Sequence, residues 1–124
     1  MVSGNAKTQQ RKFDVELPDT VERWIRVTSA QKSEATTRKR ESHLRSWCQW
    51  CDDRELPVHS ADELDVEDYL IKLIEADEKA DSTVRGYFYS LKGYYDYAET
   101  RGEIESNPTS EHSISDWVDL SRTK

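Results

Sequence analysis

The spacing of apolar residues between Ser82 and Gly102 limits the fold more than any other feature of the sequence. With each residue turned about 100° from the last, seven apolar or aromatic side chains fall on one broad arc of a helix: Val84, Tyr87, Phe88, Leu91, Tyr94, Tyr95 and Ala98. Ser82 is the expected N-cap, and Gly102 is well placed just beyond the C-terminus. A helix of this kind has to bury its apolar arc against other helices.

Three earlier segments show the same periodicity. The first predicted helix follows Pro18, is capped by Asp19 or Thr20 and ends between residues 29 and 32; its stripe is Val21, Trp24, Ile25 and Thr28. The second runs from about Glu34 to Asp53, with Leu44, Trp47, Cys48 and Cys51 on one face. In the third, Asp65 is the expected cap and Asp68 its partner, and the inner face is Val66, Tyr69, Leu70, Leu73 and Ile74.

The composition agrees with an all-α fold. The 124 residues include only four Gly and three Pro, and hydrophobic and charged residues each make up 35%. We therefore expect one compact bundle of four helices over residues 17–108, a disordered tail over 1–16, and a linker or short fifth helix over 109–124. That fifth helix would carry Ile114, Trp117 and Val118. Because the sequence lacks a secretory signal and a membrane-spanning stretch, we expect a soluble, cytoplasmic protein without membrane contact.

The segment "SWCQWCD" contains both cysteines, Cys48 and Cys51, at Cys-x-x-Cys spacing. A structural zinc site needs about four ligands, and His43, His59 and His112 are too scattered to complete a set. A redox pair normally lies at a helix N-terminus after a strand, whereas these cysteines come late in a predicted helix. We therefore interpret them as small core residues, and expect neither a metal nor another cofactor.

Charge is distributed unevenly along the chain. Residues 1–60 carry 11 basic and nine acidic side chains, and residues 61–124 carry seven and 16, which gives the total of −7. Two segments escape the acidic excess: residues 36–46 hold four basic residues and one acid, and residues 82–95 hold two basic residues and no acid. An acidic surface also suits a protein from a high-salt cytoplasm, and this alternative stays open. Because DNA binding requires clustered cations, the two segments are the candidates for a phosphate-binding surface.

Two segments resemble the N-terminal core-binding domain, also called SAM-like, of the tyrosine recombinases and phage integrases. In "TTRKRESHLRSWCQWCDDRELP", Thr36, Leu44 and Trp47 fit the family pattern, and Arg40 stands where an aromatic residue is usual. The segment "STVRGYFYSLKGYYDYAETRGEIESNP" has the Ser-Thr-apolar opening and the closing Gly-x-Ile-x-x-Asn-Pro, and "LDVEDYLIKL" is similar to the linking helix between them. The resemblance covers residues 21–108.

The resemblance implies the DNA-binding part of a site-specific recombinase, in which two helices form half of a clamp around double-stranded DNA at a recombination half-site. Cleavage and rejoining would be carried out by a separate catalytic domain of the same recombinase, acting as a tetramer on DNA. We expect no catalytic activity from this chain, because it has no His-x-x-Arg motif and no nucleophile paired with a histidine base. The isolated domain would be a monomer, derived from a longer integrase or acting as a natural truncation that competes for its site.

The candidate DNA contacts combine the family match with the charge pattern. They are Thr36, Arg38, Lys39, Ser42 and Arg45 on the second predicted helix, with His43 beside Lys39 on the adjoining side, and Ser82, Thr83, Arg85, Gly86, Tyr89 and Lys92 on the fourth. Hydroxyl groups and backbone N–H groups at a helix N-terminus suit a phosphate, and an Arg or Lys that reaches a base edge would specify sequence.

A protein-interaction module is the alternative function. On the fourth predicted helix Gly86, Ser90 and Gly93 form a stripe of small residues, which a partner helix or a nucleic-acid backbone could approach closely. A basic helix face can also be ordinary solvated surface, and Ser82 and Thr83 can act only as a cap.

Overall fold

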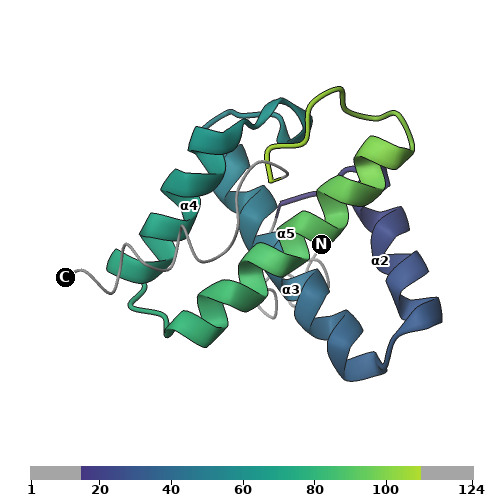
Figure 1. The fold of residues 1–124 in the computed structure, drawn as a ribbon, viewed down its shortest axis with the longest axis horizontal. Coiled ribbons are helices and arrows are strands. Elements are labelled where there is room, and N and C mark those ends of the chain that lie inside the picture. Colours follow the sequence, from purple (N-terminus) through teal and green to yellow (C-terminus); the bar gives the residue numbers. More distant parts are fainter. Residues whose placement is uncertain (1–14, 110–124) are drawn as a thin grey trace, which may run out of the picture.

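Four helices surround a core whose five largest fully buried side chains are aromatic: Trp47, Tyr69, Tyr94, Tyr95 and Phe88. The computed structural model describes residues 15–109, which form α2 (Asp19–Gln31), α3 (Glu34–Asp53), the 3-10 turn η1 (Val58–Ser60), α4 (Glu63–Glu75) and α5 (Asp81–Thr100). No strand occurs in this part of the chain, so the predicted all-α bundle of four helices is confirmed. Helix α5 crosses α3 near the centre of the molecule, and α2 and α4 lie on either side (Figure 1).

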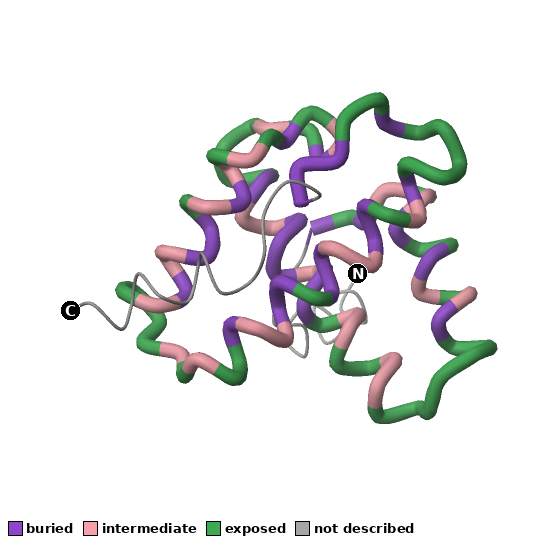
Figure 2. The backbone as a smooth tube through the Cα atoms, in the orientation of Figure 1, coloured by how far each residue is buried: buried purple, intermediate pink, exposed green. Residues whose placement is uncertain are grey.

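The predicted inner faces of the helices do form the core (Figure 2). All seven arc residues of α5 are buried, as are the four residues of the α3 stripe. Buried hydroxyl groups find partners: Trp47 Nε1 donates to the Tyr95 hydroxyl at 2.9 Å, which in turn donates to the Val58 carbonyl at 2.7 Å. An aromatic core of this kind combines large buried area with polar atoms that require one arrangement.

The predicted N-terminus of α5 is wrong by two residues. The helix begins at Asp81 after Ala80, which has no side chain to cap it, so Ser82 lies inside the first turn and is not the N-cap. An acidic side chain in the first turn interacts favourably with the helix dipole, which favours the earlier start. The other end is as predicted, because Gly102 has a φ of 77°, a left-handed conformation that glycine adopts without strain.

The expected caps of α2 and α4 are also wrong. Helix α2 starts at Asp19 after Pro18 and has no side-chain cap, although its end at Gln31 lies within the predicted range. In α4 the capping box is Asp62 with Asp65, not Asp65 with Asp68. The Asp62 carboxylate accepts from Asp65 N at 3.0 Å, and the Asp65 carboxylate accepts from Asp62 N at 2.9 Å. Both pairs have the same spacing in the sequence, and the earlier one adds a turn to the helix.

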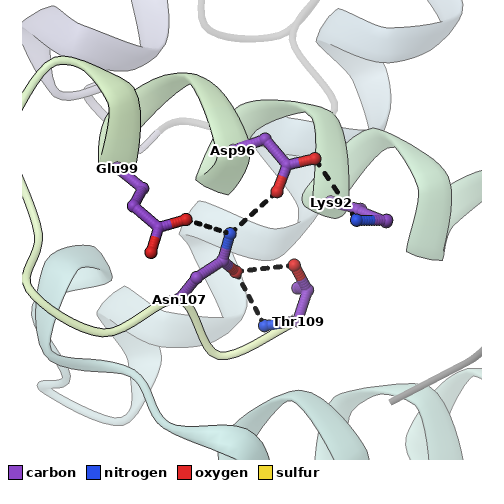
Figure 3. A network of polar contacts seen from close by, with 5 residues as sticks. All are labelled: Lys92, Asp96, Glu99, Asn107 and Thr109. Atoms are coloured by element: carbon purple, nitrogen blue, oxygen red, sulfur yellow. Dashed lines mark hydrogen bonds and ion pairs between the residues drawn. The ribbon is translucent and has the colours of Figure 1, made fainter. Parts of the chain in front are cut away.

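After α5 the chain returns along the helix and is held by Asn107 (Figure 3). The Asn107 amide donates to the carboxylates of Asp96 at 2.8 Å and Glu99 at 3.4 Å, and its oxygen accepts from both Thr109 N and Thr109 Oγ1. Asn107 and Thr109 are buried. The closing Asn-Pro of the sequence motif therefore packs the last described residues onto α5.

Ahead of α2, Val15 and Leu17 are buried and join the core. Residues 1–14 of the predicted tail, and the predicted short helix around Trp117, lie outside the described residues. Among the helices between residues 15 and 109, none has the length and apolar character needed to cross a bilayer.

Candidate nucleic-acid interface

The N-terminal halves of α3 and α5 enclose two adjoining hollows. One has a volume of about 270 Å³, and its lining is Ala35, Thr36, Lys39, Arg40, His43, Gly86, Tyr89 and Ser90. The other has a volume of about 280 Å³, and its lining is Lys39, His43, Ser82, Thr83 and Gly86. Because Lys39, His43 and Gly86 line both, we treat the two hollows as one feature, the α3–α5 groove.

Six of the eleven candidate contacts line this groove. They are Thr36, Lys39, Ser82, Thr83, Gly86 and Tyr89. Ser82, Thr83 and Tyr89 are exposed, and 54% of the Tyr89 surface is open to solvent. The crossing of α3 over α5 therefore brings together residues that lie more than 40 positions apart in the sequence.

The floor of the α3–α5 groove is His43, which the sequence placed beside Lys39 near the surface. The structure buries the ring: His43 Nδ1 shares a hydrogen bond of 2.8 Å with Ser90 Oγ, and the imidazole stacks on Tyr87 at 4.0 Å between ring centroids. Burial, together with the positive charges of Lys39 and Lys79, lowers the pKa of His43 to about 4. His43 is therefore neutral near pH 7, and joins the two helices rather than carrying charge.

The cations near the groove differ from the predicted set. Lys39 and Arg85 form no ion pair with any residue between 15 and 109. Lys79 is a cation that sequence reasoning missed: its ammonium lies 5.6 Å from the centre of the Tyr87 ring and acts on His43. It was missed because it follows a run of acids, and only the turn between α4 and α5 brings it back toward α3.

The other five candidates lie outside the groove, and three of them are paired with acids on their own helix. Arg38 contacts Glu34 at 2.7 Å, Arg45 contacts Glu41 at 2.9 Å, and Lys92 contacts Asp96 at 3.3 Å (Figure 3 shows the last pair). These are helical i,i+4 pairs, and exposed pairs of this kind contribute at most about 1 kcal/mol. Ser42 and Arg85 complete the five.

The stripe of small residues on α5 is largely filled from within the molecule. A Cβ atom at Gly93 would lie 3.0 Å from Trp24 Cζ2, so α2 occupies the space beside that glycine. Ser90 is buried against His43. The expectation of an open stripe is therefore wrong for Gly93, and Ser90 lines one hollow while its side chain is held by His43. Within residues 15–109, Gly86 is the member of the stripe that lines both hollows.

The Cys-x-x-Cys pair belongs to the core, as its place on the α3 stripe indicated. Both thiols are free and buried. Burial raises the pKa of Cys48 to about 12, and burial with the neighbouring Cys48 raises that of Cys51 as well. Within residues 15–109, no three His, Cys, Asp or Glu side chains are arranged to hold a metal ion. Thiols in this state are protonated and unreactive near neutral pH.

Comparison with known proteins finds no family model, no curated protein sequence and no solved structure that matches this chain.

Proposed function

We propose that this chain binds double-stranded DNA through the α3–α5 groove, as the core-binding domain of a site-specific tyrosine recombinase or integrase. The observation that carries the proposal is the meeting of candidate contacts. Residues chosen from two separate sequence segments, on charge and on family resemblance, line one groove. The crossing of α3 and α5 played no part in selecting these residues, and it nevertheless brings six of them to the same groove.

The chemistry of the groove suits the phosphodiester backbone. Lys39 supplies an ammonium that forms no ion pair with an acid between residues 15 and 109. Ser82 and Thr83 supply exposed hydroxyls, and the first turn of α5 presents the positive end of a helix dipole. Lys79, in the turn before α5, and Arg85, near the start of α5, add positive charge. Phosphate contacts of this type position a protein on a duplex, while base contacts supply specificity.

The cations outside the groove that are paired with acids would make weaker contacts with DNA. Arg38 and Arg45 each hold an acid of α3, and a DNA phosphate would compete with a carboxylate for the same guanidinium. In this proposal DNA cleavage belongs to a catalytic domain of the same recombinase, and the chain by itself is a monomeric half of a clamp. Its affinity alone is modest, since half a clamp buries half the interface.

The direct test removes Lys39 and Arg85, the two candidate cations that form no ion pair with an acid between residues 15 and 109. We expect Lys39→Ala with Arg85→Ala to weaken binding to a fluorescent duplex and to reduce the slope of log affinity against log salt by about 2, because each lost phosphate contact contributes about 0.9. Fluorescence anisotropy over a salt series measures both. The matched control is Lys72→Ala with Arg101→Ala, which removes the same charge from the last turn of α4 and from the C-terminal cap of α5. Equal binding by both double variants would contradict the proposal.

A further inference from the structure

Helix α5 contains two interior glycines, and the fold explains only one of them. Glycine inside a helix makes folding about fivefold less favourable than alanine does. At Gly93 the exchange is blocked, because an added Cβ would meet the Trp24 ring at 3.0 Å. At Gly86 the only atom of residues 15–109 that an added Cβ would meet within 4 Å is His43 Cε1, at 3.4 Å, an ordinary van der Waals contact.

Backbone conformation does not require glycine at position 86 either. The residue lies in the second turn of a 20-residue helix, between residues with side chains, and its φ is helical rather than positive. Within residues 15–109, neither a steric clash nor the backbone conformation therefore requires glycine at this position.

The position of Gly86 in the α3–α5 groove gives a reason for glycine at this point of the helix. It lines both hollows, along with Lys39, while Ser82 and Thr83 lie one turn before it on the same helix. The missing Cβ keeps the surface of α5 open where the two hollows join. Any side chain here would take up space next to groups that suit a phosphate.

We propose that Gly86 is the point at which the sugar–phosphate backbone of a bound duplex lies directly against α5; this rests on the proposed DNA binding. The contact is with the backbone, because the flanking hydroxyls and ammonium are phosphate ligands and position 86 has no side chain with which to read a base. Gly86 therefore controls affinity on all sequences alike.

The test is Gly86→Ala, measured for folding and for binding. We expect the variant to be at least as stable as the wild type, with a folding equilibrium constant up to about fivefold higher. We expect its affinity for each of several duplexes of unrelated sequence to fall about tenfold or more, by a common factor. Urea unfolding and fluorescence anisotropy provide the two readouts. A fall on one sequence only would overturn the assignment to the backbone.

Two comparisons separate this inference from the proposal beneath it. If the wild type binds duplex DNA, Lys39→Ala with Arg85→Ala weakens it and Gly86→Ala leaves it unchanged, then Gly86 has no such role and the DNA-binding proposal stands. If the wild type binds no duplex at low salt, both fail. A less stable Gly86→Ala protein would show that the fold itself needs this glycine. Gly93→Ala is the control, and should lose stability because of Trp24.

Discussion

Tyr95 links three parts of the chain through one hydroxyl group. It accepts from the Trp47 indole of α3 and donates to the carbonyl of Val58 in η1, and its ring is fully buried. Both partners lose contact with water in the folded protein. The hydroxyl therefore determines how η1 and α3 fit against α5, beyond the area that the ring buries.

We expect Tyr95→Phe to destabilise the protein by about 1–3 kcal/mol, because it leaves the Trp47 N–H and the Val58 carbonyl buried without partners. The free energy of unfolding, from urea titration, measures the loss. Tyr89→Phe removes the same atom from a side chain that is 54% exposed, and should change stability little. Similar values for the two variants would argue against the role of the Tyr95 hydroxyl.

His43 should make stability depend on pH. Its folded-state pKa of about 4 lies below the usual value of 6.5, so the unfolded chain takes up a proton first as the pH falls. The folded protein is therefore most stable, as far as His43 is concerned, above about pH 6.5, where the imidazole is neutral in both states. As the pH falls from 6.5 to 4, the free energy of unfolding decreases progressively, by up to about 3 kcal/mol. Unfolding at pH 7.5, 6 and 5 should show a steeper loss for the wild type than for His43→Gln. Parallel curves would count against this account.

The extent of each helix was predicted well from the sequence, whereas the first residue of the helix was often predicted wrongly. The bounds of α3 were predicted at Glu34 and Asp53 as the structure has them, because its apolar stripe is long and regular. The start of α4 was missed because neighbouring Asp residues offer two possible capping boxes of the same spacing. The start of α5 was missed because the helix begins after Ala80 without a side-chain cap, which no sequence pattern marks. Which cap is used depends on the preceding loop, and that loop is placed by tertiary contacts.

The corrected caps lead to a paired prediction. Asp62→Ala should cost about 1 kcal/mol, because it removes the side chain that accepts from Asp65 N at the start of α4. Ser82→Ala should be nearly neutral for stability, since Ser82 lies in the first turn and caps nothing. Thermal unfolding of the two variants compares them directly. A larger loss for Ser82→Ala would restore the cap predicted from sequence.

At the scale of the whole molecule, the hollows at the two ends of α3 and α5 have linings of opposite charge within residues 15–109. The N-terminal halves form the groove with Lys39, while the loops after the C-terminal ends enclose a hollow of about 710 Å³ whose lining includes the acids Asp62, Glu63, Glu103 and Glu105. Such a distribution turns one end toward a polyanion and the other away. Segment charges predicted the cationic side, but the ion pairs of Arg38 and Arg45 and the approach of Lys79 depend on side-chain placement, which composition does not contain.

The contact of Trp24 with Gly93 has a mechanical consequence. The indole of α2 fits where α5 has no side chain, and one turn along α5 in either direction it would meet Tyr89 and Ser90 or Asp96 and Tyr97 instead. The packing of Trp24 against Gly93 therefore favours one register of α2 relative to α5. The contact therefore opposes sliding of α5 along α2, the helix that carries Trp24.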